Sequence, residues 1–140
     1  MDIEGSFLPV TERAARERYE ALAPAAEAVV REATTAMEFD SEEYDRRVTS
    51  AVVETARDAL FASMLAVRVG TREEYRAWRD RTEQAVHETG SEHVAGVVWH
   101  APPFAEEAVA ATFQSERDAA VETLRRQAYG RLYREILADG

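Results

Sequence analysis

Apolar residues in the first half of the chain recur every three or four positions, which is the spacing of one face of an α-helix. One stripe follows Thr11, and a second follows Pro24, a residue type that favours the first turn of a helix. A third stripe, from Asp40 to about Met64, covers more than half of the helix circumference. The pattern predicts two short helices that meet at a bend, followed by one long central helix buried on several sides.

In the second half of the chain the spacing first becomes alternating. Leu65–Val69 predicts a short strand that ends at Gly70, and a helix follows from Arg72 to about Thr82. Ala85–Thr89 and Val94–Ala101 flank a Gly90-Ser91 turn and predict a hairpin.

The segment Ala108–Gln114 is compatible with either a helix or a strand. A helix cap at Ser115 favours the strand, because the last helix then begins at Glu116 and runs to about Leu137. Five apolar residues of that helix are expected to face inward: Ala120, Val121, Leu124, Ala128 and Leu132.

Short polar residues mark the starts of several helices. Thr11 is a plain N-cap candidate, and three pairs fit the capping-box pattern of a polar cap and an acid three positions later: Asp40/Glu43, Thr71/Glu74 and Ser115/Asp118. The elements predict one α+β domain over residues 1–140. A helical layer at 11–64 packs on a β-α-β-β-β-α unit at 65–137, whose sheet is mainly antiparallel.

The charged residues narrow the possible environment and partners. All 17 basic residues are arginine, against 27 acids, which gives a formal net charge of −10. This balance suits molar salt, where the screening length is about 3 Å, although a genome that favours arginine codons is an alternative explanation. Nucleic acid and anionic membranes are not expected partners, because both attract basic surfaces.

The composition also excludes thiol chemistry, because the chain contains no cysteine. Its first residues lack the basic start and apolar run of a signal peptide, and no apolar stretch approaches the roughly 20 residues that span a bilayer. We therefore expect a cytoplasmic protein.

Several segments resemble a family of small acidic haloarchaeal proteins of unknown function. The resemblance spans about residues 25–135 and rests on Ala36–Asp40, Thr55–Phe61, Val98–His100 and the run from Ala111 to Arg134. It implies a similar fold in a haloarchaeal cytosol. It supplies no catalytic residue, ligand or partner.

Three histidines, His87, His93 and His100, fall in or beside the predicted hairpin. Hairpin pairing would place His87 and His93 on opposite faces, and no HxH, HxxxH or HExxH spacing occurs. No nucleophile-elbow motif is present, and a single glycine at Gly70 does not make a nucleotide loop. We expect no metal and no cofactor.

The most suggestive candidate site is the helix after Thr71. Arg72, Arg76 and Arg79 form one stripe beside Tyr75 and Trp78, and arginine next to aromatic residues is typical of protein-binding surfaces. The alternative is that these arginines pair along the helix while the aromatic rings pack on the sheet. A second stripe, of Tyr129, Tyr133 and Ile136, is either an oligomer contact or part of the core.

The leading hypothesis is a non-catalytic binding or interaction module that self-associates, with a homodimer as one candidate state. A different protein partner is the alternative. The rival is a small enzyme or metal-dependent protein with a pocket near Trp99, His100 and Phe104, at the Pro102-Pro103 bend.

Overall fold

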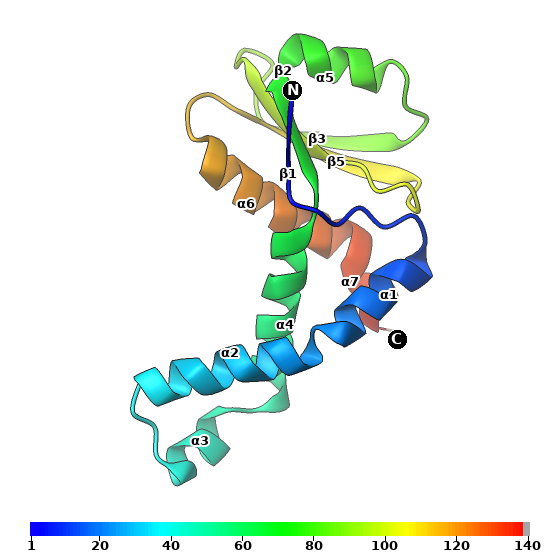
Figure 1. Cartoon of the computed structure of the whole chain (residues 1–140). Coiled ribbons are helices and arrows are strands. Elements are labelled where there is room, and N and C mark those ends of the chain that lie inside the picture. The colour runs from blue at the N-terminus through cyan, green and yellow to red at the C-terminus, as the bar shows by residue number, and fades with distance from the viewer. Residues whose placement is uncertain (139–140) are drawn as a thin grey trace.

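Five strands form one mixed sheet, in the order β1-β2-β4-β5-β3, in the computed structural model, which describes residues 1–138 (Figure 1). The strands are β1 (Asp2–Glu4), β2 (Val67–Thr71), β3 (Ala85–Thr89), β4 (Gly96–His100) and β5 (Glu107–Phe113). All neighbours are antiparallel except β3 and β5, which are parallel. The strand at 108–114, chosen over a helix, is confirmed as β5.

Helices cover both faces of this sheet and extend away from it. They are α1 (Glu12–Ala21), α2 (Ala23–Ala36), α3 (Ser41–Arg47), α4 (Ser50–Met64), α5 (Arg72–Arg79), α6 (Arg117–Ala128), the π-helix η1 (Tyr129–Tyr133) and α7 (Arg134–Ala138). Helix α5 packs on one face of the sheet, and α6 packs on the other (Figure 1). The predicted α+β class, with N-terminal helices and a mainly antiparallel sheet, is confirmed. Within residues 1–138, no helix is both long and apolar enough to cross a bilayer.

The predicted hairpin between β3 and β4 is wrong. Strand β3 pairs with β5, with His87 opposite Val109, while β4 lies between β2 and β5. Residues 97–100 of β4 are all buried, so this strand belongs inside the sheet, whereas the largely exposed β3 suits an edge. The intervening loop is tied to β5 instead, because the Ser91 amide donates to Thr112 Oγ1 at 2.8 Å.

The predicted long helix from Asp40 to Met64 is also wrong in two respects. It is broken at Val48, which has an extended backbone, and at Thr49, whose hydroxyl caps α4 by accepting from the Val52 amide at 3.4 Å. Two successive β-branched residues favour such a break. Only Phe61 and Ala62 of α4 are buried, so this helix is not central. The predicted bend between α1 and α2 is confirmed at Leu22.

The helix caps agree with prediction at three of four positions. Thr11 and Asp40 each accept a backbone hydrogen bond from three residues on, and Thr71 forms a complete capping box with Glu74. Ser115 is not the cap of α6: the helix begins at Arg117 and the N-cap residue, Glu116, makes no side-chain bond.

The C-terminal helix is interrupted by a π-helical turn that the periodicity did not predict. After α6 the backbone widens over Tyr129–Tyr133 before α7 resumes. Tyr129 and Tyr133 are buried, so of the two readings of their stripe, the core is correct. Four of the five residues predicted to face inward on α6 and η1 are buried, and Ala120 is half-buried.

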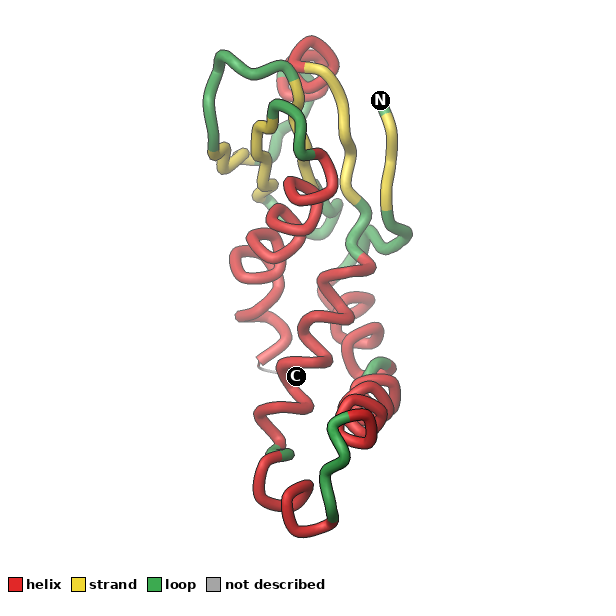
Figure 2. Tube along the Cα trace, turned by 90° about the vertical axis from the view of Figure 1, so that its left-hand side faces the viewer, coloured by secondary structure: helices red, strands yellow, loops and turns green. Residues whose placement is uncertain are grey.

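Helices α2 and α3 project away from the sheet (Figures 1 and 2). Helix α2 packs mainly on α4 and touches the end of α1. We call residues 23–54 the arm; it contains α2, α3 and the first turn of α4.

The buried His100 joins the sheet to the C-terminal helix. Its Nδ1 lies 2.6 Å from the carbonyl oxygen of Ala66, and its Nε2 lies 2.7 Å from the hydroxyl of Tyr133. Since a carbonyl can only accept, Nδ1 carries the proton and the tyrosine O–H donates to Nε2. Burial lowers the pKa of His100 to about 4 and thereby keeps the imidazole neutral.

This burial predicts a pH-dependent stability. The unfolded chain takes up a proton at His100 near pH 6.5, whereas the folded chain resists protonation until about pH 4. Stability should therefore fall as pH drops from 6.5 towards 4, with a limiting slope of about 1.4 kcal/mol per pH unit from this residue.

Denaturant unfolding of the native chain and of His100→Gln, measured from pH 7 to 5, checks this expectation. The variant should show a shallower pH dependence. Parallel curves for the two proteins would mean that His100 does not couple protonation to folding.

Candidate functional site

The polar groups predicted to form a binding surface on α5 already have partners within the chain. The Arg72 guanidinium donates to the carbonyl oxygens of Val94 at 2.8 Å and Ser91 at 2.7 Å. Arg79 forms an ion pair with Glu88 at 2.9 Å. Arg76 is exposed. Two of the three arginines therefore help to hold the β3–β4 region in place.

The aromatic residues of the same surface pack on the sheet. Tyr75 is buried, and its ring lies 5.3 Å from that of Trp99, while the half-buried Trp78 lies 5.7 Å from Trp99. The Tyr75 hydroxyl donates to Glu88. The five residues are thus brought together on α5, but only Arg76 and part of Trp78 remain free for a partner, and binding there stays a prediction.

The pocket expected near Trp99, His100 and Phe104 does not form, because successive side chains of a strand point to opposite faces. Trp99 packs with Tyr75 and Trp78 under α5. His100 packs instead with Tyr133 on the other face, and Phe104 lies 5.5 Å from the same tyrosine. The rival hypothesis therefore loses the cavity on which it depended.

The three histidines lie in separate environments. His100 is buried, His93 is exposed, and His87 Nε2 lies 2.5 Å from Glu107 Oε1 across the β3–β5 pair. In the part of the chain that the structure describes, no group of three His, Cys, Asp or Glu side chains is arranged to hold a metal ion.

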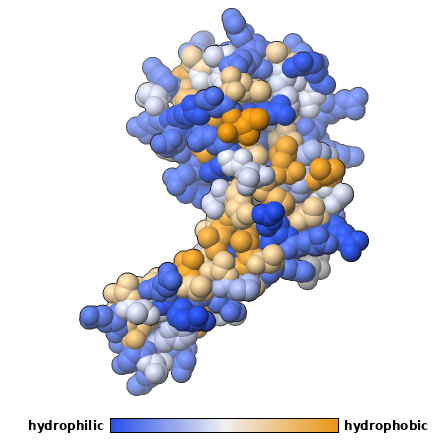
Figure 3. All heavy atoms as spheres, in the orientation of Figure 1, coloured by the Kyte–Doolittle hydropathy of each residue, from blue (hydrophilic) through white to orange (hydrophobic). Residues whose placement is uncertain are grey.

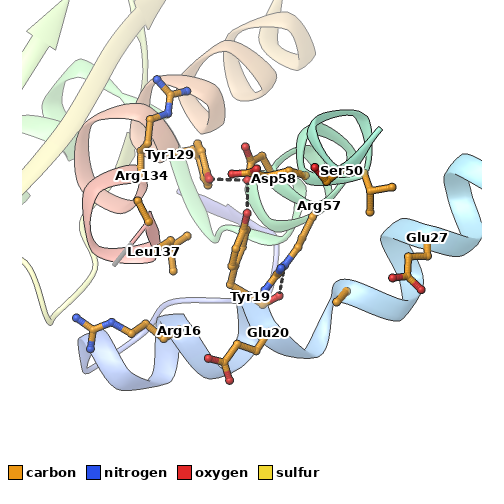
Figure 4. A pocket seen from close by; sticks show the side chains of 14 residues that line it. Arg16, Tyr19, Glu20, Glu27, Ser50, Arg57, Asp58, Tyr129, Arg134 and Leu137 are labelled. Carbon is orange, nitrogen blue, oxygen red and sulfur yellow. Dashed lines mark hydrogen bonds between the residues drawn. The ribbon is translucent and has the colours of Figure 1, made fainter. Parts of the chain in front are cut away.

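A cleft of about 580 Å³ opens where the arm joins the rest of the chain, between α1, α2, α4 and the C-terminal helices (Figure 4). At its centre, the hydroxyls of Tyr19 and Tyr129 both donate to Asp58 Oδ1, each at 2.6 Å. These residues come from α1, α4 and η1, so one carboxylate links three segments that are distant in sequence. The π-helical turn begins at Tyr129, and such turns frequently occur at functional sites.

The environment of the cleft keeps its two phenols protonated. Burial and the bond to Asp58 raise the pKa of Tyr19 to about 12, and the same two causes raise that of Tyr129 further. Both phenols therefore stay protonated at neutral pH and act as hydrogen-bond donors. The Arg57 guanidinium lies 3.8 Å from the centre of the Tyr19 ring, and its Nε donates to the Tyr19 carbonyl at 2.8 Å.

The sequence analysis missed this cleft. Asp58 lies 39 residues from Tyr19 and 71 from Tyr129, so no local motif connects them. The helical pattern does not single out Asp58 either, because Glu54 lies one turn earlier on the same face of α4.

The arm carries a second feature of functional interest, an apolar surface open to solvent. Val29 is 46% exposed, Met37 62% and Val52 42%. In the view of Figure 3, hydrophobic residues run along the arm between its hydrophilic tip and the rest of the chain. These residues come from α2, its C-cap and the start of α4, and exposed apolar surface that is gathered on one part of a molecule is typical of an interaction site.

The fold and these surfaces define a small α+β protein with a projecting helical arm and a cleft at the base of that arm. A family model matches residues 6–134, and the chain belongs to that family, a family of unknown function (DUF5809). Neither the search of curated proteins nor that of solved structures found a match. The resemblance to a family of unknown function is confirmed, while its haloarchaeal character stays a prediction.

The shared carboxylate predicts a large effect of one substitution. Asp58→Ala leaves two partly buried hydroxyls without an acceptor and should lower the free energy of unfolding by about 2 kcal/mol. Glu54→Ala, one turn earlier on α4 and in the same cleft, is the matched control and should change stability by less than about 0.5 kcal/mol. Chemical denaturation of both variants checks this. Equal stabilities would show that Asp58 does not hold the three segments together.

Proposed function

We propose that this protein is a non-catalytic interaction protein that self-associates through its arm. The observation that carries the proposal is the position of Val29, Met37 and Val52, exposed large apolar residues on the segment that projects from the sheet. The cleft tyrosines, with raised pKa values, give no support to a catalytic role.

The apolar stripe of helix α2 is only partly covered by the rest of the chain. Ala26, Val30 and Thr34 are its only buried residues. The adjoining stripe is exposed although it is apolar: Val29, Ala33, Ala36 and Met37. A stripe of this width normally faces a core on its whole breadth. Covering a half-exposed valine or methionine contributes roughly 1 kcal/mol, so several such contacts supply a useful part of an association free energy.

The charges of α3 can pair between two copies of the chain, even though the arm as a whole is acidic. Helix α3 carries Glu42, Glu43 and Asp45 before Arg46 and Arg47. A two-fold antiparallel contact between two α3 helices places the acids of one copy opposite the arginines of the other. The small residues Ala33 and Ala36 allow the backbones of two α2 helices to approach closely.

We also infer that association and folding are adapted to high salt. The arm contains eight acids and three arginines, in a chain with 27 acids and no lysine. Two such arms repel at low ionic strength, and at molar salt the screening length of about 3 Å removes most of that repulsion. A melting temperature that does not rise from low to molar KCl would contradict this second inference.

Sedimentation equilibrium in molar KCl tests the proposed self-association. The native chain should form dimers, and Val29→Glu should weaken the dimer about 30-fold or more, because it buries an unpaired charge in the contact. Glutamate is a good helix former, so the exposed position should tolerate it without unfolding.

Val10→Glu is the matched control, because Val10 is also an exposed valine, at 68%, but lies outside the arm. It should leave the dimer intact. A native chain that stays monomeric, or a dimer that survives Val29→Glu as well as Val10→Glu, would refute association through the arm.

A further inference from the structure

A second cavity, of about 570 Å³, lies beside the C-terminal helix, between the β3 edge of the sheet and the π-helical turn, and Arg134 lines both this cavity and the cleft. Strands β3 and β5 contribute His87, Thr89 and Val109 to its lining. The C-terminal helices contribute Gln127, Gly130, Arg131 and Arg134. We call this cavity the β3 pocket.

The charge of this lining contrasts with that of the whole chain. The protein carries 27 acids and 17 arginines, and the cleft at the base of the arm is lined by four acids and three arginines, one of which is Arg134. The β3 pocket has two arginines and no acid in its lining. Within residues 1–138, Arg131 and Arg134 make no ion pair, a state that they share with most arginines of the chain. Two unneutralised guanidinium groups beside one cavity are suited to an anion.

The π-helical turn shapes the pocket. Gly130 lies in this turn and has no side chain, and a Cβ placed there would come within 4.0 Å of both terminal nitrogens of Arg134. The missing side chain therefore leaves room beside the Arg134 guanidinium. The same guanidinium lies 5.6 Å from the centre of the Tyr129 ring, which restricts its position.

The groups on the sheet side complete a set of donors. A carboxylate adjoins this lining, because Glu107 Oε1 lies 2.5 Å from His87 Nε2. The Thr89 hydroxyl and the Gln127 amide are neutral donors on opposite sides of the pocket. Val109 supplies an apolar surface.

We propose that the β3 pocket binds the phosphate group of a small anionic molecule. Arg131 and Arg134 hold the phosphate oxygens, since a guanidinium presents paired N–H donors that match an oxyanion. Gln127 and Thr89 bind the remaining acceptors. The volume exceeds that of a phosphate ion alone, so an organic portion of the ligand lies against Val109. The site is separate from the arm and does not depend on self-association.

An NMR titration of the full chain with inorganic phosphate tests the proposal. Amide chemical shifts report binding, and the KCl concentration is the lowest that keeps the chain folded. Saturable shifts are expected at residues 127–134 and 87–89. Arg131→Gln/Arg134→Gln should weaken phosphate binding at least about tenfold. Arg76→Gln/Arg81→Gln removes the same charge from two exposed arginines in and just after α5, outside the lining of the pocket, and should leave binding unchanged.

Gly130→Glu provides a second test without removing an arginine. The new carboxylate lies beside Arg134 and occupies the site from within the chain, so phosphate binding should be lost while the fold persists. Three results would overturn the proposal: equal weakening by the two arginine pairs, no saturation in the native chain, or undiminished phosphate binding by Gly130→Glu.

Malonate serves as a dicarboxylate probe. Binding of malonate without phosphate would overturn the assignment to phosphate.

Discussion

The ring of Phe61 contacts four other aromatic rings, and through them it holds the helices to the sheet. The rings of Phe7, Tyr19, Tyr129 and Tyr133 surround it at 5.1 to 5.9 Å between centroids, all edge to face. Edge-to-face pairs add about 0.5–1.5 kcal/mol each beyond the burial of their area. Phe61 therefore joins the N-terminal segment, α1, α4 and η1 at one fully buried point.

The polar interactions of the structure depend on the same cluster. Tyr19 and Tyr129 pack against Phe61 and direct their hydroxyls to Asp58, while Tyr133 packs against it and bonds His100. The ring thus positions both the cleft and the link to β4. The arm begins where this support ends, because residues 23–54 contribute no side chain to the core cluster that contains Phe61.

Local sequence patterns predicted some elements of both halves of the chain and not others. The α+β class, the position of β5, the bend at Leu22 and the capping box at Thr71 follow from local patterns and are confirmed. The pairing of β3 with β5 depends on which strand is buried inside the sheet and which lies at its edge. The Gly90-Ser91 turn predicts a reversal of the chain but does not determine the order of the strands. The helix break at Val48-Thr49 and the π-helical turn interrupt regular α-helices. The spacing of apolar residues continues across both interruptions and therefore does not predict them.

The candidate sites were less predictable still. Sequence reasoning selected five residues because they share one helix: Arg72, Tyr75, Arg76, Trp78 and Arg79. In the structure the two aromatic rings pack against Trp99, and Arg79 pairs with Glu88. The surfaces that the structure favours combine residues far apart in the chain. The arm is the exception, since its apolar stripe was visible in the sequence and only its exposure was not.

The central claim is that two copies meet through their arms, and a distance between copies tests it most directly. The chain has no cysteine, so Glu32→Cys on α2 gives a single spin label on the arm, and Glu122→Cys gives one on α6. In molar KCl, pulsed dipolar spectroscopy should give one narrow intermolecular distance for the label at position 32, and a longer one for position 122. The account would be contradicted if labels at position 32 showed no dipolar coupling between copies, or if the distance between labels at position 122 were shorter than that at position 32.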